Sequence, residues 1–269
     1  MNAKANIAAV VVSYEALPFL TACLHSLEQV AEISDIVVVD NASSDGTADW
    51  LRTCPANIRV IANERNLGFA AAVNQGCQAT TAPYLLLLNC DVEVPVGAIA
   101  PLLAFLLSQD RAAAACARLL TPAGHEQLRV RNQRRPIALR WAPAAALLLR
   151  RQALEQVGWF DPLFFFYNED IDLGIRLRRA GWQIYLVPNS WVIHHEGKST
   201  DRIRHETIVH GYRGGLYLIK KHYAWALPLA RMGIHLEVHL RALVYRFLPR
   251  RTAKQQAFLA AFPALCREL

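Results

Sequence analysis

The strongest constraint on the fold is a set of four short aliphatic runs in the first third of the sequence. The runs occupy residues 7–14, 36–40, 59–63 and 85–88, and polar residues follow each of them. Near-continuous aliphatic runs are typical of parallel strands that are covered on both faces of a sheet. The sequence therefore predicts four buried strands whose carboxyl ends carry polar side chains.

Helical patterns separate the four runs. We expect Ser43, Ser44 and Asp45 to cap the second helix and residues 70–77 to form the third. The first helix has one apolar face, formed by Leu17, Leu20, Leu24 and Leu27. This alternation predicts an α/β fold with a Rossmann-like, mostly parallel, doubly wound sheet. Parallel strands end at one edge of such a sheet, so the polar residues are expected to line a nucleotide-binding crevice.

Two carboxylates stand directly after the fourth run. Asp91 and Glu93, separated by one residue, lie at the predicted carboxyl end of this strand. Two hard oxygen ligands suit Mg²⁺ or Mn²⁺, above all where a substrate diphosphate supplies the remaining ligands. The alternative is a solvated loop that follows a core strand.

A second group of carboxylates surrounds a predicted helix start. Glu169, Asp170 and Asp172 lie at the beginning of a helix expected over residues 171–180. These side chains could simply complement the helix dipole. The aromatic run at residues 164–167 favours a further role, because burial beside aromatic rings makes a carboxylate a better base.

Two histidines end a later apolar segment. His194 and His195 close a strand expected to begin near Trp191. A single histidine there would usually be structural, whereas a pair at the mouth of the crevice suits a metal ligand. Only one of two neighbouring strand residues can face the site.

Composition predicts one substantial enzyme-sized domain. The chain has 269 residues, 54% of them hydrophobic and 19% charged, which allows a large core. Six cysteines without CxxC spacing indicate reduced core residues of a cytosolic protein. The first residues carry no apolar leader, and no apolar stretch reaches a membrane-spanning length.

The positive charge is concentrated in the last quarter of the chain. Residues 201–269 contain 12 Lys and Arg against 4 Asp and Glu, whereas residues 1–200 contain 17 against 18. Residues 223–247 interleave arginines with leucines and aromatic residues. This pattern is compatible with a helix on an anionic membrane surface or with a packed helical pair whose charges are solvated. Nucleic acid is a weaker alternative, because no binding motif accompanies the charge.

Six motifs in order resemble glycosyltransferase family 2, and bacterial rhamnosyltransferases and their O-antigen or cell-wall relatives in particular. The motifs lie at residues 11–15, 38–47, 63–69, 89–92, 167–173 and 194–197. The resemblance extends over about residues 5–222. It implies a GT-A fold at 1–222, and the charge pattern predicts a basic amphipathic helical extension at 223–269.

The resemblance also implies an activity. The expected reaction is inverting transfer of a sugar, with rhamnose as one candidate, from a UDP- or dTDP-sugar to a hydroxyl of a surface-glycan or lipid-linked acceptor. The expected location is the cytoplasm or the inner face of the plasma membrane. A sugar nucleotidyltransferase would share the crevice, but residues 13–17 are not the glycine-rich loop that usually opens such an enzyme. A non-catalytic sugar-nucleotide-binding scaffold is disfavoured, because Asp91, Asp170 and His194 occur together.

The family motifs assign metal and catalytic roles to this chain. Asp91 resembles the direct ligand of Mn²⁺ or Mg²⁺, with Glu93 as a second candidate. His194 resembles a further ligand, and the adjacent His195 is its alternative. Asp170 resembles the general base.

The remaining assignments concern substrates. Glu169 is a neighbour of the base that could bind acceptor. Asp40 resembles the aspartate that contacts the nucleotide base. The other residues assigned to the nucleotide are Ser13, Tyr14, Glu15, Arg65, Asn66 and Asn89.

Overall fold

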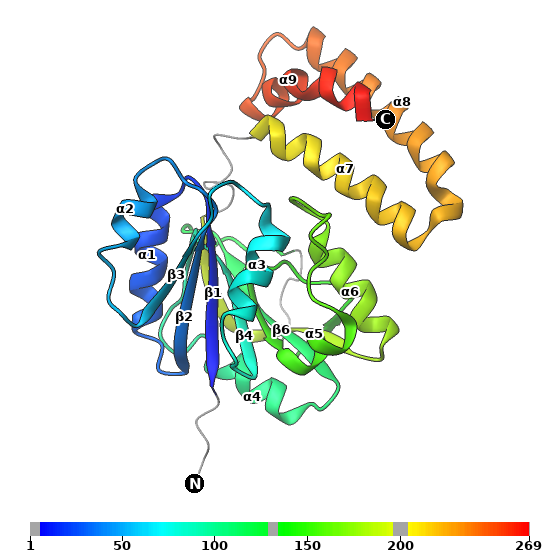
Figure 1. The fold of residues 1–269 in the computed structure, drawn as a ribbon. Coiled ribbons are helices and arrows are strands. Elements are labelled where there is room, and N and C mark those ends of the chain that lie inside the picture. The colour runs from blue at the N-terminus through cyan, green and yellow to red at the C-terminus, as the bar shows by residue number, and fades with distance from the viewer. Residues whose placement is uncertain (1–5, 129–133, 196–203, 269) are drawn as a thin grey trace. The chain divides into compact units, whose positions relative to one another are not determined.

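The chain forms two compact units in a computed structural model that describes residues 6–128, 134–195 and 204–268 (Figure 1). The first unit comprises Met1–Asp161 and Asp170–Ser199, and the second comprises Pro162–Glu169 and Thr200–Leu269. This division groups residues 204–222 with the C-terminal helices, whereas the sequence motifs group them with the first domain. The division at residue 222 therefore stays a prediction.

The first unit is built on one mixed sheet. Its first strands are parallel and run in the order β3-β2-β1-β4, which confirms the predicted doubly wound half. The order then continues β8-β6-β9-β5, with β7 paired to β9, and here parallel and antiparallel pairs are mixed. The strands of the described chain are β1 (Ile7–Ser13), β2 (Ile33–Asp40), β3 (Ile58–Ala62), β4 (Tyr84–Asn89), β5 (Val92–Glu93), β6 (Ala112–Leu120), β7 (Ile137–Leu139), β8 (Ala146–Arg150) and β9 (Gln183–His194).

Two strands differ from the sequence prediction. β3 lies at the edge of the sheet and exposes Arg59, Val60 and Ala62, so it is not covered on both faces. β9 begins at Gln183 rather than near Trp191. Its pairing with β6 shifts register between Leu186 and Trp191, and the extra residues include a proline that interrupts the strand pattern in the sequence.

Helices cover both faces of the sheet. One core cluster joins the sheet to side chains of α1, α2 and α4, and a second joins its other face to α3, α5 and α6. The bounds are α1 (Leu17–Glu28), α2 (Thr47–Leu51), α3 (Phe69–Gln78), α4 (Ala100–Ser108), α5 (Arg151–Val157) and α6 (Glu169–Arg179). The apolar face predicted for the first helix is confirmed, since Leu20, Leu24 and Leu27 are buried.

Four of the six cysteines are buried, as predicted for core residues, whereas Cys54 and Cys266 are half-buried. All six are free. Burial raises the pKa of the Cys77, Cys90 and Cys116 thiols to about 12. A thiol with so high a pKa is a poor nucleophile at neutral pH, so these three side chains contribute packing rather than chemistry.

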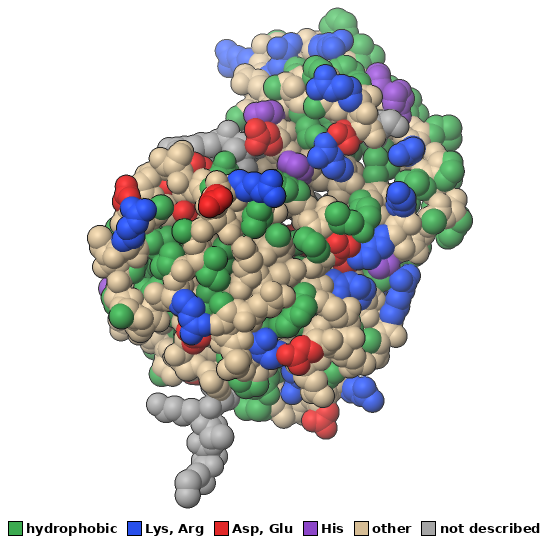
Figure 2. Space-filling view, viewed as in Figure 1, with side chains coloured by type: hydrophobic (Ala, Val, Ile, Leu, Met, Phe, Trp, Pro, Cys, Tyr) green, Lys and Arg blue, Asp and Glu red, His purple; other side chains and the backbone are tan. Residues whose placement is uncertain are grey.

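The second unit is helical, which confirms the predicted C-terminal helices. It contains α7 (Arg204–His222), the short 3-10 helix η2 (Ala224–Ala226), α8 (Leu227–Phe247) and α9 (Ala253–Glu268). Its own small core consists of Val238, Ala242, Phe258, Ala261 and Leu265. Lys and Arg side chains are frequent on its surface (Figure 2). Within the described residues, no helix is long and apolar enough to cross a bilayer.

Candidate active site

Asp91 is a buried carboxylate at the carboxyl end of β4. Its side chain is 1% exposed, and among the described residues no hydrogen-bond donor reaches either carboxylate oxygen. The solvated-loop alternative is therefore wrong for Asp91. An ionised carboxylate in this position carries a desolvation cost that a bound cation would offset.

His194 faces Asp91. The antiparallel pair of β5 and β9 sets Val92 opposite His194, and His194 Nε2 lies 3.4 Å from Asp91 Oδ1. His195 donates its backbone N–H to the Asp91 carbonyl at 3.0 Å. The backbone pairing sets His195 opposite Asp91, but the side-chain distance identifies His194 as the imidazole beside the Asp91 carboxylate.

Gln127 fixes the orientation and tautomer of His194. Its Nε2 donates to the His194 carbonyl oxygen at 2.7 Å, so its Oε1 is the atom that lies 2.7 Å from His194 Nδ1. An amide oxygen only accepts, so Nδ1 carries a proton, and the neutral imidazole has its free lone pair on Nε2, the nitrogen that lies 3.4 Å from Asp91 Oδ1. The sequence motifs did not identify Gln127, since it stands in an irregular segment after β6.

Glu93 and His195 form a separate pair. Glu93 Oε1 lies 2.6 Å from His195 Nε2, and the His195 ring packs 5.5 Å from the ring of Phe19. Both side chains are more exposed than Asp91 and His194. The geometry thus divides the four predicted metal-site residues into two pairs. The last two residues of the motif, Glu196 and Gly197, lie outside the described residues.

The pair of Asp91 and His194 has the donor types that Mn²⁺ accepts. Neither it nor any other part of the described chain supplies three or more His, Cys, Asp or Glu side chains in one metal-binding group. Two protein ligands leave most coordination positions to a substrate diphosphate and water, which is how Mg²⁺ and similar ions are commonly held at phosphate sites.

Polar side chains at the ends of β1 and β2 shape one loop. Asp40 is buried and accepts hydrogen bonds from Ser43 N and Ser43 Oγ at 3.3 and 2.5 Å. Glu15 has a left-handed backbone conformation, and its Oε1 accepts from Ser44 N and Oγ at 2.7 and 2.8 Å. Ser13 is fully buried, and Tyr14 is half-buried.

The predicted cap of the second helix is only partly correct. Asp45 accepts from Thr47 N at 3.1 Å and from Leu17 N at 2.9 Å, so one carboxylate caps α2 and α1 together. Ser43 and Ser44 bond to strand-end carboxylates instead. The sequence did not indicate the contacts of Ser44 with Glu15 and of Asp45 with Leu17, because these partners lie 29 and 28 positions apart in the chain.

The loop before α3 is organised by amides. Asn66 Oδ1 accepts from Asn41 Nδ2 and Gly68 N at 2.8 and 2.9 Å. Arg65 is exposed and Asn89 is half-buried. The acceptor oxygen of Asn66 is thus used within the protein. The nucleotide contacts expected of these residues stay predictions.

Asp170 begins α6 together with Glu169, which is buried. Burial raises the pKa of the Asp170 carboxyl to about 6, even though Oδ1 accepts a hydrogen bond from Ile171 N at 2.8 Å that favours ionisation. Asp172 is fully buried, and Arg176 Nε donates to it at 2.8 Å. A carboxyl group with a pKa of about 6 is suited to accept a proton near neutral pH.

The backbone immediately before Asp170 is unusual. Tyr167 and Asn168 both have positive φ, at 69° and 71°. Asn168 Nδ2 donates to the Gly211 carbonyl at 3.1 Å, and a Cβ on Gly214 would lie 2.9 Å from that same nitrogen. Consecutive left-handed residues without a glycine are costly and cluster at functional sites.

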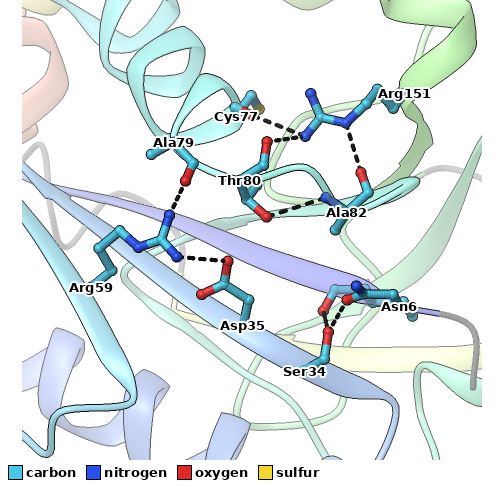
Figure 3. A network of polar contacts seen from close by, with 10 residues as sticks. Asn6, Ser34, Asp35, Arg59, Cys77, Ala79, Thr80, Ala82 and Arg151 are labelled. Carbon is cyan, nitrogen blue, oxygen red and sulfur yellow. Dashed lines mark hydrogen bonds and ion pairs between the residues drawn. The ribbon is translucent and has the colours of Figure 1, made fainter.

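A hollow of about 300 Å³ lies at the amino ends of the parallel strands, opposite the carboxyl ends that carry the candidate site. It is lined by residues that bond to one another, as Figure 3 shows. Arg59 pairs with Asp35 at 3.5 Å, and Arg151 donates to the carbonyls of Cys77, Thr80 and Ala82 at 3.0, 2.8 and 2.7 Å. These contacts secure the end of α3 and the entry to β4, so we assign the hollow a structural role.

Comparison with known proteins points to one family. The model described as "Glycosyl transferase family 2" matches residues 8–172, and "Glycosyl transferase family group 2" matches residues 129–262. The chain is 28% identical over 294 aligned positions to the N-acetylglucosaminyl-diphospho-decaprenol L-rhamnosyltransferase of Mycobacterium tuberculosis. That alignment covers 92% of this chain and 95% of that protein.

Solved structures agree on the fold. A mannosyltransferase from Pyrobaculum calidifontis in complex with GDP-Man and Mn²⁺ has a TM-score of 0.60 and 16% identity, covering 97% of this chain and 86% of that one. S. aureus TarS 1–349 in complex with UDP has a TM-score of 0.62 and 13% identity, covering 97% and 83%. These neighbours confirm the predicted GT-A-like α/β fold with C-terminal helices.

Proposed function

The chain belongs to glycosyl transferase family 2, and we propose that it is an inverting, metal-dependent enzyme that transfers a sugar from a nucleoside diphosphate to a lipid-linked glycan. The buried Asp91 carboxylate beside the oriented Nε2 of His194 is the observation that carries this proposal. It supports a cation site at the sheet edge where α/β folds hold nucleotides. L-rhamnose is the candidate sugar, since the mycobacterial relative is named as a rhamnosyltransferase.

The donor would lie along the carboxyl ends of β1, β2 and β4. Asp40 would accept a hydrogen bond from the nucleotide base, in a pocket lined by Ser13, Tyr14 and Glu15. Arg65, Asn66 and Asn89 would contact the ribose and phosphates. The bonds from Ser44 to Glu15 support a loop that is already organised before the donor binds.

Asp91 and His194 would hold the divalent cation, and Gln127 would keep the imidazole turned toward it. When bound, Mn²⁺ or Mg²⁺ supplies positive charge to the diphosphate, which becomes more negative as the sugar leaves. The Glu93–His195 pair is a less suitable ligand set, because its two side chains bond to each other at 2.6 Å.

Asp170 would act as the general base. The acceptor hydroxyl oxygen attacks the anomeric carbon on the face opposite the diphosphate, its proton passes to an Asp170 carboxylate oxygen, and the diphosphate leaves with the electrons of the broken C–O bond. Attack from the opposite face inverts the anomeric centre. Glu169, next in the chain, would bind the acceptor. A pKa of about 6 supports this role, since the carboxylate is ionised at neutral pH yet basic enough to take a proton.

Donor binding is the direct test of the function. The purified protein is heated with Mn²⁺ and each of dTDP-L-rhamnose, UDP-N-acetylglucosamine and GDP-mannose. We expect one donor to raise the Tm, because ligand that binds only the folded state stabilises it. Transfer to a synthetic polyprenyl-diphosphate sugar is then measured with that donor. Pyrophosphate release from a sugar phosphate and a nucleoside triphosphate would instead identify a nucleotidyltransferase, and binding without transfer or hydrolysis a scaffold.

Gln127→Ala should weaken metal binding rather than unfold the protein. Loss of the amide frees His194 to rotate and to change tautomer, and loss of such an outer hydrogen bond typically costs about 10- to 100-fold in metal affinity. The measurement is the Mn²⁺ concentration that gives half of the donor-induced rise in Tm. Gln29→Ala, which removes an exposed glutamine of α1's end, is the matched control. An unchanged Mn²⁺ requirement in Gln127→Ala would remove Gln127 from the site.

A further inference from the structure

α8 carries a continuous apolar stripe that is exposed. Its residues are spaced by three or four positions, which places them on one face of the helix. They are 52–80% exposed, and they are Leu229, Met232, Leu236, Leu240, Leu243 and Phe247. From Leu229 to Phe247 the stripe extends about 27 Å at 1.5 Å per residue. Trp225, 84% exposed, stands immediately before it.

This stripe is not the face by which α8 packs in its own unit. Val238 and Ala242, about half a turn away around the helix, are 0% and 2% exposed and belong to the core shared with α9. The helix therefore has two apolar faces, one used within the unit and one open. A run of large exposed apolar side chains on a folded helix usually marks a binding surface.

Basic residues accompany the stripe. Residues 227–269 contain seven Lys and Arg against two Asp and Glu. Arg231, Arg250 and Lys254 are exposed, and Figure 2 shows Lys and Arg side chains beside hydrophobic ones over the C-terminal helices. Three other arginines have structural contacts, since Arg241 pairs with Glu237, Arg246 lies over the Phe262 ring and Arg251 donates to the carbonyls of Tyr245 and Arg246.

We propose that the α8 stripe docks the protein on an anionic bilayer surface, with the helix lying in the plane of the headgroups. The positive charge of this segment favours a bilayer over a second copy of the protein as the partner of the stripe. A second copy of the stripe would bring like-charged segments together, whereas anionic headgroups attract them. An exposed apolar helix face in a basic segment, with aromatic residues at both ends, has the composition of helices that lie in the interface.

The benefit of this docking for catalysis rests on the proposed function, because a docked enzyme and a lipid-linked acceptor would be confined to the same membrane surface. The binding itself does not depend on that function. Vesicle binding and sugar transfer are measured separately, so that a negative result for one proposal does not affect the test of the other.

The test compares vesicles of phosphatidylglycerol and phosphatidylcholine with vesicles of phosphatidylcholine alone. The protein should sediment with the anionic vesicles at low salt and be released at high salt. Leu236→Gln, Leu240→Gln and Leu243→Gln together should lower the partition coefficient at least about tenfold, because exposed leucines that would enter the interface are lost. Glutamine keeps helix propensity, and Leu107→Gln on α4, 57% exposed, is the matched control.

A charge variant tests the second half of the proposal. Arg250→Glu and Lys254→Glu together should lower binding at least about tenfold at low salt, at about 1 kcal/mol for each basic residue near the surface. Both variants should retain the wild-type far-UV circular dichroism and the donor-induced rise in Tm. The proposal is overturned if the wild type ignores anionic vesicles at low salt, or if the leucine variant binds them equally well. It is also overturned if the wild type is a dimer that the leucine variant converts to a monomer, since the stripe would then be a subunit interface.

Discussion

Asp91→Asn is expected to lower kcat about a thousandfold or more while the protein remains folded. The substitution keeps the shape of the side chain but removes the charge that would hold a cation against the diphosphate, and interactions made to developing charge are lost mainly from kcat. The carboxylate is buried, and no described donor reaches its oxygens. An amide costs less to bury there, so the Tm without Mn²⁺ should stay equal or rise. The measurements are steady-state transfer and Tm with and without Mn²⁺.

Glu93→Gln is the matched control. It removes a carboxylate two residues away that is bonded to His195 rather than to the Asp91–His194 pair. It should therefore change kcat far less than Asp91→Asn does, and the Mn²⁺-dependent rise in Tm with donor should persist. Full activity of Asp91→Asn, or full activity of the wild type in EDTA, would overturn the metal assignment.

The parallel half of the fold was predictable because each of its strands is a short aliphatic run that can be recognised without knowing the rest of the structure. The aliphatic runs that became β1, β2 and β4 are buried almost throughout, so burial and pattern agree. β3 has the same kind of run but lies at the sheet edge. A short run cannot reveal whether a neighbour will cover it, since that depends on the strand order. The antiparallel return through β8 is likewise decided by pairing between distant segments.

The residues of the candidate site likewise fall into those that the sequence identified and those that depend on contacts between distant segments. Asp91 was identifiable because it follows a run of leucines, whereas the choice of His194 over His195 required the side-chain positions, which put His194 beside Asp91 and His195 beside Glu93. Gln127 gave no signal, because its role depends on the contact between a segment after β6 and the end of β9. Reactive side chains that follow a strand directly can be predicted from the sequence. Residues in irregular segments that orient those side chains, such as Gln127, cannot.

Asp170→Asn is expected to abolish transfer while donor binding is retained. The amide has nearly the shape of the carboxyl group but cannot accept the acceptor's proton, and loss of a general base typically costs about 10²- to 10⁴-fold. Glu169→Gln should act differently, raising the KM for the acceptor with a smaller change in kcat. Normal transfer by Asp170→Asn together with inactive Glu169→Gln would mean that Glu169 is the base.

The pH profile separates this role from a structural one. Burial raises the pKa of Asp170 to about 6, so the proton is retained up to that pH, and the base form appears only as the pH rises through it. The wild-type kcat/KM should therefore fall about tenfold for each pH unit below about 6 and level off above it. The residual activity of Asp170→Asn should lack this inflection.

Asp172→Asn provides the contrast on the same helix. Asp172 is fully buried and bonded to Arg176 at 2.8 Å, so its loss leaves a largely buried guanidinium without its charge partner and should lower stability by about 3–5 kcal/mol. The folded fraction of that variant should keep the inflection near pH 6, because its proton acceptor is intact. A wild-type profile that is flat between pH 5 and 8 would remove Asp170 from the chemistry, whatever the activity of its variants.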